Sequence, residues 1–425
     1  MTSQQLAAHF FLQVTLILLV CRLVGGLMPR IGQPKVVGEM IAGVLLGPSL
    51  LGVLSPSLQT WLFPPQSLGA LSLISQLGLV LYMFVVGTHL QIDFIRQAYR
   101  GALLISLAGI VAPFVLGAGL AAVLYRDGGF FAPSLSSWQS MIYLGAAMSV
   151  TAFPVLARII QDKGISGTTI GTLALAAGAT DDAIAWCLLA IVLAGVNHDP
   201  VLAGSAIVGG TLYTVVVLSL LRPRLAKLKS IVDRDGSLAP GTLALVLALL
   251  MAGAWFTDAI GIHAVFGAFI MGIAMPRGLF AKELARHIEP LATTLLIPLF
   301  FVYSGLSTRV NLLASSGLWL IAIVVIVIAS VGKGVACWTA GVFAGRPSRE
   351  ALAIGALMNA RGLMELIILN IGLERGMITS SLFTVMVTMT IATTLAAGPL
   401  FEWAWRGAAK VPNTPASMAV QQIKE

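Results

Sequence analysis

Charged side chains are scarce in this 425-residue chain: Asp, Glu, Lys and Arg make up only 10% of it, whereas hydrophobic residues make up 58%. An ordinary soluble domain carries roughly 25% charged residues, so a soluble fold would lack the charge that its surface needs. The scarcity therefore argues against a typical soluble protein and indicates that much of the surface faces lipid.

Cysteine is also rare, with three residues. Cys21, Cys187 and Cys337 lie far apart in apolar runs and lack the short spacing of metal ligands. We predict that they are small buried side chains. The sequence contains no signal for a cofactor.

Long apolar runs are what the chain has in abundance. A run of about 20 residues matches the hydrocarbon core of a bilayer, and backbone groups in lipid must bond within their own segment. We predict an all-α polytopic membrane protein with about thirteen transmembrane helices. The predicted spans are 8–28, 36–53, 67–88, 101–125, 139–160, 169–195, 201–221, 240–258, 262–276, 290–307, 314–345, 350–372 and 378–404.

Basic residues alternate between the loops that join these spans, with 19 on one side and three, Arg126, Arg309 and Arg375, on the other. The positive-inside rule then predicts a multi-pass cell-membrane protein with its N-terminus outside and its C-terminus cytoplasmic. It also explains the net charge of +8 without a nucleic-acid partner. The basic set comprises Arg30, Lys35, Arg96, Arg100, Arg158, Lys163, Arg222, Arg224, Lys227, Lys229, Arg234, Arg277, Lys282, Arg286, Arg346, Arg349, Arg406, Lys410 and Lys424.

Two short segments recur in the second half of the chain. Residues 38–47 resemble 263–272, and residues 81–87 resemble 299–305. The copies are seven spans apart, so the second enters the membrane in the opposite direction. This pattern predicts an inverted repeat, which is typical of secondary transporters. The predicted domains are a first transmembrane half at 1–221, a cytoplasmic linker at 222–239, a second, inverted half at 240–405 and a short cytoplasmic tail at 406–425.

Asp181 and Asp182 form an acidic pair inside the span 169–195. Adjacent helical residues point about 100° apart, so the two carboxylates face different surroundings. Burial in low dielectric favours protonation, whereas oxygen ligands suit hard cations. The pair therefore predicts a site that binds either protons or a monovalent cation, although two protonated acids that serve only packing are the alternative.

Lys333 lies too deep in its span to reach either surface easily. Asp181 or Asp182 is its obvious acidic partner. The pair is either a static salt bridge or one that opens when its acid binds an ion or a proton.

Two spans are predicted to be interrupted. Pro154 lies inside the span 139–160, where Thr151 and freed carbonyl groups are candidate cation ligands. Asn359 and Arg361 place polar groups inside the span 350–372. Arg361 and Glu365 are i,i+4 neighbours on a helix, so a structural salt bridge and a transport role are both open.

Five motifs in this order resemble the second monovalent cation/proton antiporter family, which includes potassium efflux systems, plant cation/proton exchangers and bacterial sodium/proton antiporters. The resemblance covers residues from about 10 to 405. The motifs are GEMIAGVLLGPSLLG (38–52), SVTAFPVLARII (149–160), GATDDAIAW (178–186), HAVFGAFIMG (263–272) and MNARGLMELIILNIG (358–372).

The resemblance implies a homodimer in which a core domain moves like an elevator, with crossing broken helices near Thr151–Pro154 and Asn359–Gly362. Asp182 resembles the essential acid that binds Na⁺ or K⁺ and protons. Asp181 resembles the acid that pairs with a lysine in electrogenic relatives, and Lys333 resembles that lysine. Unlike potassium efflux systems, this chain has no cytoplasmic nucleotide-binding domain in its sequence.

The sequence therefore favours an antiporter that exchanges Na⁺ or K⁺ for protons. A gated potassium channel or an organic-ion exporter on the same scaffold is the alternative. An intramembrane aspartyl protease fits poorly, because its acids must come from facing helices whereas these are adjacent.

Overall fold

A computed structural model of the protein describes residues 3–89, 92–165, 168–178, 180–181, 184, 200–309, 312–313 and 317–406. Over these residues the chain is helical, apart from loops and one isolated β-bridge between Phe131 and Ile378. The prediction of an all-α membrane protein is confirmed.

The N-terminal part of the chain forms helices of very different lengths. They are α1 (Ser3–Leu27), η1 (Met28–Ile31), α2 (Lys35–Leu46), α3 (Leu51–Leu54), α4 (Pro56–Leu62), α5 (Pro65–His89), α6 (Ile92–Asp127), α7 (Ser137–Ser149) and α8 (Phe153–Asp162). After residue 200 come α10 (Pro200–Val215), the π-helix η2 (Val216–Leu221), α11 (Arg222–Asp235), α12 (Pro240–Ala259), α13 (Ala264–Ala274), α14 (Leu279–Leu291), the π-helix η3 (Ala292–Leu296), α15 (Ile297–Leu306), α17 (Leu318–Phe343), α18 (Ser348–Met358), α19 (Leu363–Glu374) and α20 (Ser380–Arg406).

Eight helical segments within the described ranges are long and apolar enough to cross a membrane. Three of the other predicted spans coincide with shorter helices: 139–160 and 350–372 are each divided in two, and 262–276 is the 11-residue helix α13. The span 201–221 corresponds to α10 and η2, and residues 182–183 and 185–195 of the predicted span 169–195 lie outside the described residues. The predicted span 36–53 is also interrupted, because α2 ends at Leu46 and α3 begins at Leu51. The predicted linker 222–239 is mostly the helix α11, which continues directly from η2 and ends at Gly236 with φ 69°.

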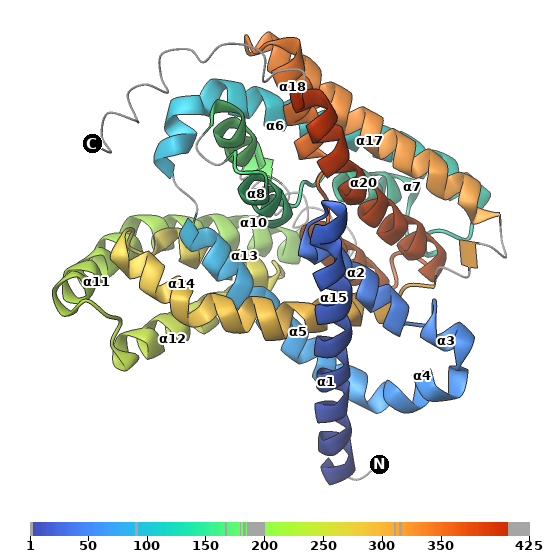
Figure 1. Ribbon diagram of the computed structural model, residues 1–425, viewed down its shortest axis with the longest axis horizontal. Helices are drawn as coiled ribbons and strands as arrows, with labels where there is room; N and C mark the ends of the chain where they lie inside the picture. Colours follow the sequence, from blue (N-terminus) through green and yellow to red (C-terminus); the bar gives the residue numbers. More distant parts are fainter. Residues whose placement is uncertain are drawn as a thin grey trace.

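The helices form two groups (Figure 1). We call α6, α7, α8, α17, α18, α19 and α20 the core group, because α17 packs on α6, α18 and α20. We call α1, α2, α5 and α10 to α15 the panel group, in which α2 packs on α1 and α15, and α5 packs on α13. In Figure 1 the core group fills the upper part of the view and the panel group the lower part. Contacts between α2 and α20 and between α15 and α19 join the groups.

Glycine allows two helix pairs of the panel group to touch backbone to backbone. A Cβ atom on Gly305 of α15 would lie 2.1 Å from the carbonyl carbon of Gly43 on α2. A Cβ atom on Gly272 of α13 would lie 2.1 Å from the carbonyl oxygen of Phe84 on α5. Any larger side chain would push these helices apart, so both crossings depend on glycine.

Candidate functional site

The predicted break in the span 139–160 is present. Helix α7 ends at Ser149, Val150 adopts an extended backbone (φ −68°, ψ 139°), and helix resumes at Phe153. Pro154 is the second residue of α8. Proline fits the first helical turn, where its missing N–H has no partner to lose, but disfavours helix before it. The break therefore follows from the local sequence.

A second break separates α18 from α19 at residues 359–362. Gly362 has φ 152°, a backbone conformation that residues other than glycine rarely adopt. The amide side chain of Asn359 donates to the Ser330 carbonyl at 3.1 Å, which fixes this break to α17. The two breaks meet, since the Ala152 N–H donates to the Ala360 carbonyl at 3.0 Å. A backbone group that has no helical partner at one break thus finds its hydrogen-bond partner at the other break.

Asp181 and Lys333 are fully buried beside the first break. Lys333 Nζ lies 3.2 Å from Asp181 Oδ2, and both side chains are 0% exposed. Lys333 Nζ also donates to the Ser149 carbonyl at the end of α7. A cation is favoured there, because the last carbonyls of a helix carry partial negative charge.

Thr151 completes this cluster. Its hydroxyl donates to Asp181 Oδ2 at 2.5 Å, so one carboxylate oxygen receives both the hydroxyl and the ammonium group. The structure therefore brings together three of the residues singled out from the sequence, on three different segments of the chain. Asp182 lies outside the described residues.

Arg361 and Glu365 form a second buried ion pair at the crossing. Arg361 Nη1 lies 3.5 Å from Glu365 Oε1, and the side chains are 0% and 1% exposed. Arg361 Nη2 donates to the Met148 carbonyl at 2.7 Å, again at the end of α7. Glu365 lies in the first turn of α19, where the helix dipole favours an acid. The pair thus links both breaks.

The sequence interpretation missed Ser106, which lies on α6 at the wall of the Asp181 cluster. Ser106 is fully buried, and its hydroxyl is close enough to interact with the Asp181 carboxyl. Around it, Cys337 Sγ lies 3.7 Å from the Ile105 carbonyl, and a Cβ atom on Gly109 would lie 3.9 Å from Lys333 Cε. The signal in the sequence was a single serine in an apolar run, which periodicity alone does not distinguish from packing.

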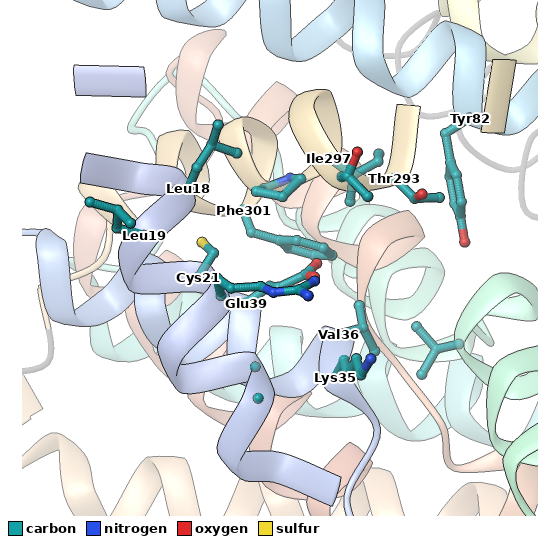
Figure 2. Close-up of a pocket in the computed structure, with 16 residues that line it drawn as sticks. Leu18, Leu19, Cys21, Lys35, Val36, Glu39, Tyr82, Thr293, Ile297 and Phe301 are labelled. Atoms are coloured by element: carbon teal, nitrogen blue, oxygen red, sulfur yellow. The ribbon is translucent and has the colours of Figure 1, made fainter. Parts of the chain in front are cut away.

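A cavity of about 680 Å³ lies among the panel-group helices, at their border with α8 of the core group. Figure 2 shows Cys21 of α1, Glu39 of α2 and Phe301 of α15 around it, and Val155 of α8 also lines it. Arg22 and Lys35 add charge to the same walls. A much smaller cavity, about 30 Å³, lies between α5, α15 and α19.

Known proteins resemble this chain in sequence and in fold. A family model described as "Sodium/hydrogen exchanger, transmembrane" matches residues 15–407. The chain is 41% identical over 391 residues to the Na(+)/H(+) antiporter NhaS4 of Synechocystis sp., covering 91% of this chain and 95% of that protein. It is 27% identical to the Na(+)/H(+)-K(+) antiporter GerN of Bacillus cereus, covering 93% and 96%.

The chain is also 37% identical to Cation/H(+) antiporter 17 of Arabidopsis thaliana, but it spans only 47% of that protein's length. Among solved structures, the sodium proton antiporter MjNhaP1 of Methanocaldococcus jannaschii shares the fold. One of its structures has a TM-score of 0.69 at 16% identity and covers 97% of this chain and 100% of the other.

Proposed function

Because the chain belongs to the sodium/hydrogen exchanger family and is therefore a monovalent cation/proton antiporter rather than an enzyme, we propose that it extrudes Na⁺ or K⁺ in electrogenic exchange for protons. We place the exchange at Asp182 and Asp181, with Lys333 as the partner that titrates. The observation that carries this proposal is the fully buried contact of Asp181 with Lys333 and Thr151 at the meeting point of two broken helices.

The proposed mechanism follows from the charge that this site must balance. A carboxylate without exposure to water needs a compensating positive charge, because an isolated buried charge is strongly disfavoured. Lys333 supplies that charge, with its ammonium group 3.2 Å from Asp181 Oδ2. When a cation enters at the acidic pair, Lys333 releases its proton and moves away from Asp181. The chain thereby exchanges more protons than cations, and each cycle moves net charge.

The proposed inverted repeat is supported by the two glycine crossings. The repeated segments fall on α2 and α13, and on α5 and α15. Helix α2 packs on α15 and α5 packs on α13, so the first repeated helix of each copy contacts the second repeated helix of the other. Two copies related by a two-fold axis give this exchange of partners. The shorter helices then complete about thirteen crossings, in halves at 1–221 and 240–405.

The proposed elevator movement uses the boundary between the core and panel groups. The large cavity at that boundary includes Val155 on the broken helix and Lys35 at the start of α2. Lys35 belongs to the basic set of loops, so we place this cavity on the cytoplasmic side, with the N-terminus outside and the C-terminus inside. The core group would carry the ion past a fixed panel group, in a homodimer.

Exchange by purified protein in proteoliposomes tests the proposal. Adding Na⁺ or K⁺ to vesicles that hold an imposed ΔpH should collapse the gradient, as reported by a pH-sensitive dye. Asp182→Asn should abolish this collapse, because an amide releases no proton. Asp258→Asn is the matched control, since Asp258 is exposed at the end of α12 and should leave exchange intact. Full activity in Asp182→Asn would overturn the site, and no response of the unmodified protein to any alkali cation would overturn the exchange.

A further inference from the structure

Helix α6 forms a wall of the Asp181 cluster, and Ser106 places a buried hydroxyl group in that wall. The neighbouring positions are apolar or lack side chains: Ile105 is buried, and Gly109 leaves room for Cys337 and for the stem of Lys333. Ser106 itself is 0% exposed. A hydroxyl in such a place normally needs a hydrogen-bond partner.

Within the described part of the chain, neither Ser106 Oγ nor Asp181 Oδ1 completes a hydrogen bond of normal geometry. Other buried hydroxyls on these helices bond to their own helix: Ser149 donates to the Ala146 carbonyl at 2.8 Å, and Thr390 donates to the Met386 carbonyl at 2.9 Å. A buried serine in a helix commonly bonds in this way. Ser106 instead lies near Asp181, whose Oδ1 atom also has no hydrogen-bond partner among the described residues. This arrangement points to a third group that binds both oxygens.

The two oxygens of Asp181 therefore differ in role. Oδ2 is already engaged by the Thr151 hydroxyl and the Lys333 ammonium group. Oδ1 has no hydrogen-bond partner among the described residues, and Ser106 lies near the same carboxyl. A carboxylate oxygen and a hydroxyl oxygen are both hard donors, the type that alkali cations prefer.

We propose that Ser106 Oγ and Asp181 Oδ1 are ligands of the transported alkali cation, so that α6 contributes to ion affinity and selectivity. The inference rests on the proposed exchange function and adds a residue to its site. Because the Ser106 hydroxyl contributes one oxygen at a fixed place on a long helix, its contribution depends on the radius of the ion. Removing it should therefore change the preference among Li⁺, Na⁺ and K⁺, beyond lowering overall activity.

The test compares Ser106→Ala and Ser106→Cys with the unmodified protein in proteoliposomes, using Li⁺, Na⁺ and K⁺ in turn. Loss of one ligand should raise the apparent KM for the preferred cation about tenfold, with a much smaller change in maximal rate. Cysteine has the same branching as serine and is only moderately larger, but it offers a soft donor, so Ser106→Cys should also raise KM. A residue needed only for packing would be rescued by cysteine.

Ser140→Ala is the matched control, because Ser140 is also fully buried but donates a hydrogen bond to the carbonyl of Ser136 at 3.2 Å. Ser136 is the N-cap residue of α7, the helix that contains Ser140. It should leave KM and the ion preference unchanged. The inference fails if the unmodified protein exchanges cations and Ser106→Ala keeps the same KM values, or loses rate equally for all three ions. If the unmodified protein exchanges none of them, the proposed function fails instead.

Discussion

At the scale of single residues, two buried cations share one helix end but have different partners. Lys333 donates to the Ser149 carbonyl and Arg361 to the Met148 carbonyl, both at the end of α7. Arg361 pairs with Glu365 four residues along its own chain segment, whereas Lys333 depends on Asp181 from another helix. The Arg361 pair therefore fits a fixed support of the crossing, and the Lys333 pair fits a contact that ion binding can break.

Replacing Lys333 with glutamine should separate its two contributions. The variant leaves the Asp181 carboxyl buried without an ammonium partner, and breaking a buried pair in this way typically lowers the free energy of unfolding by about 3–5 kcal/mol. It also removes the group whose proton, in the proposed mechanism, makes the exchange electrogenic. We expect a lower thermal unfolding temperature in detergent and a rate of Na⁺/H⁺ exchange that no longer responds to an imposed membrane potential.

The double variant Asp181→Asn/Lys333→Gln should recover much of that stability, since it removes both charges together. Lys163→Gln is the control, because Lys163 pairs with Glu402 where both side chains are partly exposed. It should lower the free energy of unfolding by no more than about 1 kcal/mol and keep the response to potential. A Lys333→Gln protein with an unchanged response to potential would contradict the electrogenic role.

The sequence predicted which residue types meet at the site but not all of their contacts. The deeply placed Lys333 was expected to pair with an acid, and it pairs with Asp181, because neither charge is stable alone in lipid. The bond from Arg361 to the Met148 carbonyl could not be predicted, since it joins residues far apart in sequence through the crossing of two helices. Ser106 was missed for the same reason: its importance depends on which helix packs against α6.

At the scale of helices, local chemistry determined the breaks and packing determined the lengths. Pro154 and Gly362 mark the two interruptions within a few residues. In contrast, α13 is only 11 residues long, and Leu279–Leu306 is one continuous helical segment rather than a span that starts at 290. Hydropathy alone does not show where a short helix is shielded by its neighbours, so span counts and boundaries were less predictable than the breaks.

Gly362→Ala tests the second break. An alanine at φ 152° is strained, and its Cβ would lie 3.1 Å from Val155 Cγ2 on α8. We expect the free energy of unfolding to fall by about 1–3 kcal/mol, and exchange to slow, because the crossing would shift. Gly69→Ala is the control, since Gly69 lies in α5 with nothing within 4 Å of an added Cβ; it should be neutral or slightly stabilising. Equal thermal unfolding temperatures for the two variants would show that the strain is absorbed elsewhere.

At the scale of the whole molecule, the proposed movement implies that the boundary between the core and panel groups is open at the large cavity and closed where α15 contacts α19. Ile297 and Phe301 of α15 line the cavity of about 680 Å³. Two polar contacts join α15 to α19 near the small cavity. Tyr303 donates to Glu374 Oε1 at 2.8 Å, and Asn370 donates to Ser304 Oγ at 3.1 Å. If the groups slide past each other during exchange, these contacts must break as the closed end opens.

Tyr303→Phe removes one of the bonds that hold this end closed. A single side-chain hydrogen bond contributes about 1 kcal/mol, so its loss should shift the population toward the opposite-facing state about fivefold. The readout is the labelling rate of Thr294→Cys by a membrane-impermeant thiol reagent, in a background whose three natural cysteines are alanine. Thr294 lines the large cavity, so labelling should slow as that cavity closes more often.

Tyr125→Phe provides the comparison that isolates the movement. It deletes the same atom from a bond of similar length, from Tyr125 to the Leu135 carbonyl at 3.0 Å, but both residues belong to the core group or its adjoining loop. In the proposed movement that bond stays within the core group and does not need to break, so labelling of Thr294→Cys should stay at its original rate. Slower labelling in both variants would indicate a general loss of order, and slower labelling in neither would mean that the contact at Tyr303 does not oppose the movement. Only a difference between the two tyrosines ties the closed end of the boundary to alternating access.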